Sequence, residues 1–138
     1  MSATQGVEIV VELTGLTCVS HHGPSGATVK TSPPADNGGD GSSYSPTDLL
    51  ATSLATCALT TMALQAGREA LSWGSASAKV LKIMGGPPRR VETLRLAITM
   101  PKGVKPEHRA RLEEVARTCP VARSLHPDLK VPLTFEYP

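Results

Sequence analysis

An uncharged stretch near the middle of the chain limits what this sequence can fold into more than any other feature. Residues 49–66 carry no charged side chain. Ser45 can cap a helix, with Pro46 at the first helical position and Asp48 three residues after the cap. Gly67 suits the C-terminal end. The sequence therefore predicts one helix of about 21 residues, roughly 31 Å long, and apolar all round, so that most of its sides must be covered.

A helix of this length and composition also fits a membrane. Its hydroxyl side chains, and the lack of a second apolar segment of this kind, argue against that interpretation. The hydroxyl residues are Thr52, Ser53, Thr56, Thr60 and Thr61. We therefore expect this segment to be the core helix of a domain that does not bind a membrane.

Length and charge limit the remaining classes. The chain has 138 residues, which predicts one domain, 1–138. A net charge of +2 and only four aromatic residues argue against a nucleic-acid partner, because neither a basic footprint nor a stacking platform is present. So small a supply of large side chains makes a thin core, which favours burial through self-association.

Hydrophobic patterns predict an α+β domain around the central helix. The β-branched run 7–13 and the segments 16–22 and 27–32 are typical of strands, and the Gly/Pro-rich segment 33–44 is typical of a loop. After the central helix we expect a hairpin of two strands, a second helix, a short helix and a last strand. Their ranges are 75–85, 89–101, 105–118, 120–125 and 131–137.

Periodicity also predicts which side chains share a face. In the strand 89–101 we expect Val91, Thr93 and Arg95 on one face and the apolar Leu94, Leu96 and Ile98 on the other. In the second helix we expect Arg109, Glu113 and Arg117 to pair along one face. The opposite, apolar face of that helix contains Leu112, Val115, Ala116 and Cys119.

The chain has three cysteines at wide spacing. The opening residues contain no secretory apolar region, so we expect a cytoplasmic protein with reduced thiols. Cys57 alone is typical of a small packed hydrophobe. Cys119 precedes Pro120 at a helix start, which predicts a lowered pKa. Two cysteines on two apolar helices suggest a redox couple, in which one thiolate attacks and the other thiol resolves the product.

Cys18 lies in a Cys-x-x-His pattern with His21. Two ligands are too few for a zinc site. We therefore expect neither a metal nor a cofactor.

Two motifs resemble those of the OsmC/Ohr family of thiol peroxidases. They are GGDGSSYSPTDLLATSLATC, which ends at Cys57, and EEVARTCPVARSLHPDL, which contains Cys119. The resemblance implies an OsmC-like fold with curved antiparallel sheets, a long central cysteine-bearing helix and an intertwined homodimer. It also implies a peroxidatic Cys57, a resolving Cys119, an organic hydroperoxide substrate, and reduction by a dithiol or a lipoylated protein.

The sequence departs from the family at the residues that activate the thiolate. Family members resemble one another in an Arg from the early strands and a Glu ten residues before the first cysteine. Thr47 stands at that Glu position here, Asp48 follows it, and no Arg occurs before Arg68. The early hairpin offers His21, His22 and Lys30 instead. His22 is the best local substitute, since a cation beside Cys57 favours thiolate. Asp48 is the candidate orienting acid, although capping also explains it.

The sequence thus predicts an oxidative-stress enzyme that reduces organic hydroperoxides through a Cys57–Cys119 disulfide. The alternatives are a non-catalytic dimeric binding module for an apolar small molecule and a redox sensor without turnover.

Overall fold

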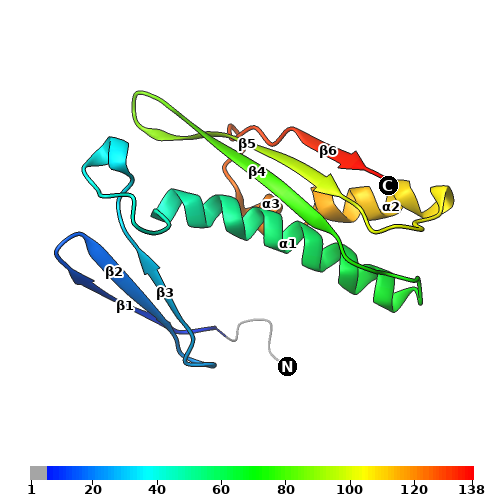
Figure 1. The fold of residues 1–138 in the computed structure, drawn as a ribbon, viewed down its shortest axis with the longest axis horizontal. Coiled ribbons are helices and arrows are strands. Elements are labelled where there is room, and N and C mark those ends of the chain that lie inside the picture. The colour runs from blue at the N-terminus through cyan, green and yellow to red at the C-terminus, as the bar shows by residue number, and fades with distance from the viewer. Residues whose placement is uncertain (1–5) are drawn as a thin grey trace. The chain divides into compact units, whose positions relative to one another are not determined.

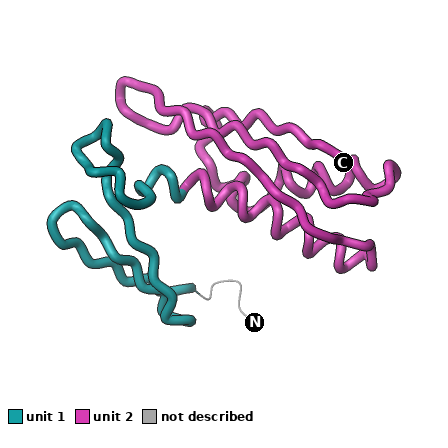
Figure 2. The backbone as a smooth tube through the Cα atoms, in the orientation of Figure 1, with its two compact units in different colours: residues 1–49 teal, residues 50–138 magenta. Residues whose placement is uncertain are grey.

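In a computed structural model the chain divides into two compact units, residues 1–49 and 50–138 (Figure 2). The structure describes residues 6–138. The prediction of a single domain over 1–138 stays a prediction. The first unit contains β1 (Ile9–Thr14), β2 (Thr17–His22), β3 (Thr28–Thr31), η1 (Ala35–Asn37) and the start of α1 (Pro46–Arg68). The second contains the rest of α1, then β4 (Ser77–Gly85), β5 (Arg90–Thr99), α2 (Pro106–Arg117), α3 (Pro120–Ser124) and β6 (Leu133–Glu136).

The first sheet is antiparallel, in the order β1–β2–β3. The antiparallel pairing is what the family resemblance implies. Its register pairs Ile9 with His22 and Leu13 with Cys18. Paired residues share a face, and the residues between them face the other way. One face is mostly apolar and holds Ile9, Val11, Leu13, Cys18 and Val29, together with Ser20, His22 and Thr31. The other face holds the charged or titratable residues Glu12, His21 and Lys30.

This first unit has no apolar core among its described residues. In the range 6–49 the buried residues are Ser32 and Ser45. Ile9, Val11 and Leu13 are 55%, 58% and 66% exposed. The sheet thus presents an apolar face that the described part of the unit does not cover.

The loop before α1 is tied back to the strands. The backbone N–H of Ser32 donates to the carbonyl of Tyr44, at 3.0 Å. A Cβ at Gly39 would lie 1.8 Å from the Pro33 carbonyl oxygen, so only glycine fits this close approach. These contacts hold the loop that leads to Ser45, at the start of α1.

The predicted capping box starts α1. The Asp48 N–H donates to Ser45 Oγ at 3.1 Å, and the Ser45 N–H donates to Asp48 Oδ2 at 2.9 Å. This satisfies two backbone donors that a helix start leaves open.

The prediction that α1 ends at Gly67 is wrong. The helix continues to Arg68, and Ala70 takes the left-handed conformation, with φ of 55°. The N–H of Leu71 donates to Ala66 O and that of Ala70 to Gly67 O, which is the Schellman pattern. The left-handed residue that ends the helix is therefore Ala70, three residues after Gly67.

The second sheet has the order β4–β5–β6. β4 and β5 form the predicted antiparallel hairpin, whereas β6 pairs with β5 in parallel. The register shifts between Ile83 and Met84. On the side of this bulge toward the start of β5, Val91 pairs with Met84 and is buried, at 7% exposure. The prediction that Val91 shares the more polar face with Arg95 is therefore wrong. A bulge adds one residue to one strand and turns the following side chains over.

The core of the second unit lies between α1, β5 and α2. Figure 1 shows α1 running beside the hairpin of β4 and β5. The small and medium residues on one side of α1 pack on alternate residues of β5, as the pattern of that strand predicted. The buried members are Ala51, Leu54, Ala55, Ala58, Met62, Val91, Leu94, Leu96, Ile98, Met100, Leu112, Ala116 and Cys119.

Within residues 6–138, α1 is the one helix long and apolar enough to cross a membrane, by length and composition only. A third of its apolar window, 33%, is buried in this chain. Its hydroxyls bond within the helix, since Thr56 Oγ1 donates to Thr52 O and Thr61 Oγ1 to Cys57 O. Such bonding lets hydroxyl residues lie on an otherwise apolar helix.

Candidate active site

Two thiols from distant parts of the chain meet inside the second unit. Cys57 lies in the middle of α1 and is half-buried. Cys119 is the N-cap residue of α3 and is fully buried. Cys57 packs against the core cluster that contains Cys119. The Cys57 thiol lies near enough to raise the pKa of the Cys119 thiol, and both thiols are free. The structure therefore brings together the two cysteines from which the sequence predicted a redox couple.

The break between α2 and α3 places Cys119. Pro120 has no N–H and its ring fixes φ, so it suits the first position of a helix and cannot continue the previous one. Thr118 ends α2, and its N–H donates to Glu114 O. The chain then turns at Cys119, whose carbonyl accepts the N–H of Arg123 at 3.0 Å.

The predicted lowered pKa of Cys119 is wrong. Burial raises the pKa of the Cys119 thiol, and the neighbouring Cys57 thiol raises it further. The backbone N–H groups of Ala122 and Val121 oppose the rise, but neither forms an aligned capping hydrogen bond. The loss of hydration therefore raises the pKa of Cys119 by more than the backbone N–H groups at the start of α3 lower it, which favours the neutral thiol.

Cys57 has a polar neighbour that the sequence analysis did not consider. Thr61 Oγ1 lies 3.8 Å from Cys57 Sγ. The same hydroxyl donates to the Cys57 carbonyl at 2.6 Å. Because its proton is used there, the hydroxyl oxygen is placed to accept from the thiol. The spacing of four residues in one helix is the signal that could have identified this contact.

An ion pair holds α2 against the end of α1. Arg111 Nε donates to Glu69 Oε2 at 2.9 Å, and Arg111 Nη2 contacts Glu69 Oε1. The Gln65 amide and then Arg111 hold the pKa of the Glu69 carboxyl below its usual range. Sequence patterns give no signal for this contact, because the two residues are 42 positions apart.

A second polar cluster fixes α2 to β6. Tyr137 donates to Glu113 Oε2 at 2.6 Å, and Arg109 stacks on the Tyr137 ring at 4.1 Å. The predicted pairing of Glu113 with Arg117 is confirmed, at 3.6 Å. Arg109 departs from that pattern because the aromatic ring attracts its guanidinium.

A cavity of about 350 Å³ lies near the start of α3, although neither Cys57 nor Cys119 lines it. It is lined by Ala116 and Ala122, three residues before and after Cys119, and by Leu54, one turn before Cys57. Arg117 supplies a charged side chain at the same cavity. The remaining lining residues are Leu96, Val131 and Leu133.

The other predicted site residues lie in the first unit. His22 is on the apolar face of the first sheet, and its Nδ1 is 2.6 Å from Ser25 Oγ. Asp48 forms the capping box with Ser45. The predicted catalytic roles of His22 and Asp48 stay predictions.

Cys18 and His21 do not form half of a metal site. The register places Cys18 on the apolar face of the sheet and His21 on the opposite face, near Glu12. Among residues 6–138, no group of three or more His, Cys, Asp or Glu side chains is arranged to hold a metal ion.

Solved structures with this fold share the architecture over almost the whole chain. A putative osmotic stress induced and detoxification response protein from Psychrobacter arcticus is 36% identical, with a TM-score of 0.89 over 98% of this chain and 100% of that one. An organic hydroperoxide resistance protein from Elizabethkingia anophelis is 17% identical, with a TM-score of 0.78 over all of both chains. OsmC from Legionella pneumophila, an organic hydroperoxide resistance protein, is 18% identical, with a TM-score of 0.76 over 98% and 99%.

Among curated proteins no significant match was found. The α+β fold that the motifs predicted is confirmed by the solved structures. The family model for OsmC-like proteins matches residues 39–134, a range that includes both Cys57 and Cys119. This chain is therefore a member of the OsmC family.

Proposed function

We propose that this chain reduces organic hydroperoxides in oxidative stress defence, with Cys57 as the attacking thiol and Cys119 as the resolving thiol. The observation that carries the proposal is the proximity of these two thiols, since Cys57 packs against the cluster that contains Cys119 and raises its pKa. They are far apart in sequence, so their meeting is a product of the fold. Two reduced thiols in contact are the minimum equipment for a reversible disulfide.

The proposed cycle balances with one added dithiol. The Cys57 thiolate attacks the distal oxygen of ROOH, the O–O bond breaks, and ROH leaves after protonation. Cys57 becomes a sulfenic acid. The Cys119 sulfur then attacks the Cys57 sulfur, releasing water and forming the disulfide. An external dithiol is oxidised as it restores both thiols, so ROOH and a dithiol give ROH, water and a disulfide.

Burial supports this assignment of roles. Cys57 is half-buried, so a peroxide can reach it. Cys119 is fully buried and its pKa is raised, which disfavours the thiolate that a first attack needs. A resolving thiol has only to reach the neighbouring sulfenic acid.

The neighbouring cavity supports an organic rather than an inorganic peroxide. Its lining is aliphatic apart from Arg117. A volume of about 350 Å³ lies in the usual range for small-molecule sites, roughly 300–1,000 Å³. An alkyl or aryl tail would lie against Leu54 and Leu133.

The structural neighbours named as organic hydroperoxide resistance proteins also support the proposal. We further propose a dithiol small molecule or a lipoylated protein as the reductant. A reducing cytoplasm would keep the three cysteines free, as they are in the structure.

We propose that a second copy of the chain covers the apolar face of the first sheet. That face exposes Ile9, Val11 and Leu13. Exposed apolar surfaces of this kind mark interaction sites. Burying the same face of two copies against each other would form the homodimer.

The test is turnover of cumene hydroperoxide with dihydrolipoamide, followed as loss of the peroxide. Cys57→Ser should abolish turnover. Cys119→Ser should allow one turnover and then accumulate the sulfinic acid of Cys57, seen by mass spectrometry. Cys18→Ser is the matched control and should retain the activity of the natural chain.

Each alternative gives a different result. A binding module would retain cumene hydroperoxide unreduced in all variants. A redox sensor would form the Cys57–Cys119 disulfide once but show no continued turnover with the dithiol. Undiminished turnover in Cys57→Ser contradicts the proposal.

The thiolate needs support, for which we propose His22 and Asp48. His22→Gln should then shift the pH dependence of peroxide reduction without changing stability, while His21→Gln, on the opposite face of the sheet, should leave it unchanged. Equal profiles for both variants rule out His22.

A further inference from the structure

A second cavity lies in the same unit, at the other end of α1 from the capping box. It has a volume of about 200 Å³. Three segments line it: the connection after α1, the loop before α2, and the first turns of α2 itself. The lining residues are Ala70, Leu71, Ser72, Trp73, Gly103, Val104, Lys105, His108 and Leu112.

This cavity is separate from the thiol pair. Arg68, where α1 ends, is eleven residues after Cys57, which is roughly 16 Å along the helix axis. None of the residues that line the cavity next to Cys119 lines this one. The peroxide chemistry proposed above makes no use of it.

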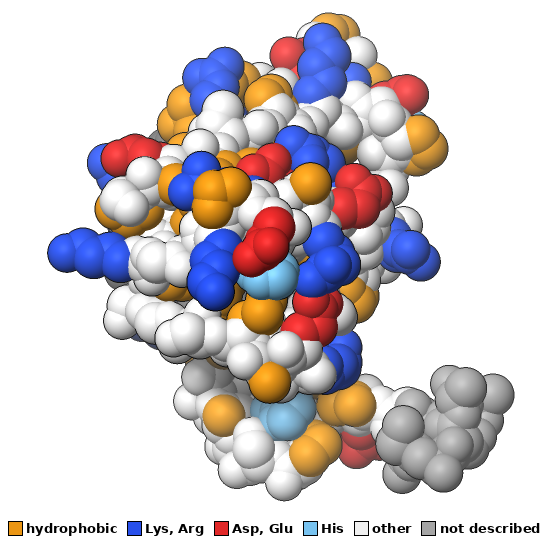
Figure 3. Space-filling view, turned by 90° about the vertical axis from the view of Figure 1, so that its right-hand side faces the viewer, with side chains coloured by type: hydrophobic (Ala, Val, Ile, Leu, Met, Phe, Trp, Pro, Cys, Tyr) orange, Lys and Arg blue, Asp and Glu red, His pale blue; other side chains and the backbone are white. Residues whose placement is uncertain are grey.

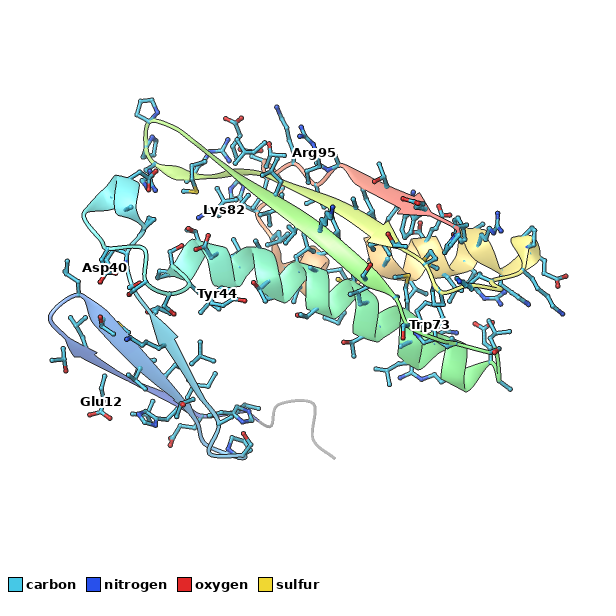
Figure 4. The ribbon with its side chains drawn as sticks, viewed as in Figure 1. Glu12, Asp40, Tyr44, Trp73, Lys82 and Arg95 are labelled. Atoms are coloured by element: carbon cyan, nitrogen blue, oxygen red, sulfur yellow. The ribbon has the colours of Figure 1, made fainter. Side chains whose placement is uncertain are left out.

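Its wall is apolar and includes one large aromatic ring. Trp73 is the only tryptophan in the chain and is half-buried. Figure 4 shows it on the connection between α1 and β4, near the start of β4. Leu71, Val104 and the buried Leu112 complete the apolar part. A flat apolar ligand can stack against an aromatic side chain in such a site.

Its polar part includes one fixed cation, the ammonium group of Lys105. Lys105 and His108 line the cavity, and Lys105 forms no ion pair with any residue that the structure describes. His108 Nδ1 lies 3.5 Å from Arg111 Nη2. In Figure 3, Lys and Arg side chains gather with a histidine on this end of the chain, with acidic side chains between them.

Two carboxylates are close, and neither neutralises Lys105. Glu69 is paired with Arg111. Glu107 lies 3.8 Å from His108 Nε2 and points to solvent, with 68% of its side chain exposed. The ammonium group of Lys105 is therefore the charge available to a bound anion.

We propose that this cavity binds a small aromatic carboxylate, with its ring against Trp73 and its carboxylate on Lys105 and His108. The volume fits this class, because a cavity of about 150 Å³ holds benzene. The remaining space suffices for one carboxylate group. An ammonium–carboxylate contact at the rim supplies the orientation, as charged groups do in apolar sites.

Benzoate is the probe, and Trp73 is the reporter. Because Trp73 is the only tryptophan, the indole N–H signal in a ¹⁵N–¹H spectrum and the intrinsic fluorescence both report on this cavity. Millimolar benzoate should shift the indole signal in a saturable way. Benzamide, which has the same ring without the charge, should bind at least fivefold more weakly.

Lys105→Gln should weaken benzoate binding by about tenfold, the size of one charge-assisted hydrogen bond. His108→Gln should weaken it less. Lys102→Gln, an exposed lysine of the same loop that does not line the cavity, is the matched control and should bind within twofold of the natural chain. Lys105 makes no capping hydrogen bond with its side chain, so its substitution should leave α2 folded.

Benzoate binding at this cavity does not depend on the proposed peroxidase activity. Cys57→Ser should bind benzoate unchanged, whatever its turnover. Absence of a saturable shift, equal affinity for benzamide, or equal losses in Lys105→Gln and Lys102→Gln would each overturn the proposed site.

Discussion

Arg111 of α2 is paired with Glu69, just beyond the end of α1, while Cys57, further back on α1, neighbours Cys119, which follows the end of α2. Along α1 the order is Cys57 and then Glu69. Along α2 and the residues after it, their neighbours come in the opposite order, so α1 and α2 lie antiparallel. The ion pair fixes one end of the helix contact, and the thiol pair lies at the other. This arrangement sets the register that brings the sulfurs together.

The ion pair predicts a pH dependence of stability. The pKa of Glu69 is lowered by Gln65 and then by Arg111. A carboxyl with a lowered folded-state pKa stabilises the fold above its unfolded pKa, and this contribution is lost as the pH falls through the folded value. Urea unfolding between about pH 3 and pH 6 should show a smaller acid loss in Glu69→Gln. Glu114→Gln on the exposed side of α2 is the control, and an equal effect there contradicts the prediction.

The thiol pair predicts unequal alkylation. Cys57 should react with iodoacetamide at neutral pH, while Cys119, buried and with a raised pKa, should react slowly until the pH is well above the usual thiol range. Peptide mapping by mass spectrometry over a pH series measures both rates. Faster labelling of Cys119 at neutral pH is incompatible with the roles proposed.

The same raised pKa affects stability in the alkaline range. Its contribution is fully present below the unfolded thiol pKa of about 8.5, and it is lost as the pH rises through the folded value. Cys119→Ala should therefore unfold with a weaker alkaline dependence than the natural chain.

The geometry at the end of α1 predicts two stabilising substitutions. Gly67 lies inside the helix, where a Cβ meets nothing within 4 Å, and Ala70 has a φ of 55°. Gly67→Ala should raise the free energy of unfolding by about 0.5–1 kcal/mol, through helix propensity. Ala70→Gly should also raise it by about 0.5–1 kcal/mol, because glycine adopts the left-handed conformation without strain. Denaturant unfolding measures both, and a loss at either position refutes this account of the helix end.

The capping box predicts that stability and catalysis separate at the start of α1. Ser45→Ala should lower the free energy of unfolding by about 1 kcal/mol, because Asp48 N–H loses its acceptor. Turnover of cumene hydroperoxide should stay near that of the natural chain. Asp48→Asn distinguishes the two roles of the carboxyl: a loss of turnover larger than the loss of stability supports the orienting acid, and parallel losses leave capping as its role.

The first sheet predicts self-association through one face. If the proposed homodimer forms, Leu13→Lys places a charge on its interface and should yield a monomer in analytical ultracentrifugation. Glu12→Lys, the neighbouring residue on the opposite face, should leave the association state unchanged. A monomeric natural chain, or equal effects of the two substitutions, would falsify the proposed interface.

Much of the fold follows from local chemistry and was predicted from the sequence. The capping box, the proline at the start of α3 and the alternation along β5 act over a few residues, so their patterns identify the elements directly. The failures are also local in origin. The end of α1 was misplaced because the turn geometry selects a left-handed residue even where it is alanine, and the face of Val91 was wrong because a bulge does not show in a pattern of alternation.

The sequence by itself determined that the chain carries two cysteines on apolar helices and a capped, uncharged central helix. Only the tertiary structure decided that Cys57 and Cys119 are neighbours, that burial raises the pKa of Cys119, and that Glu69 pairs with Arg111. The physical reason is range. Hydrogen bonding and helix propensity act between near neighbours along the chain, whereas desolvation and contact between distant residues exist only once the helices have packed.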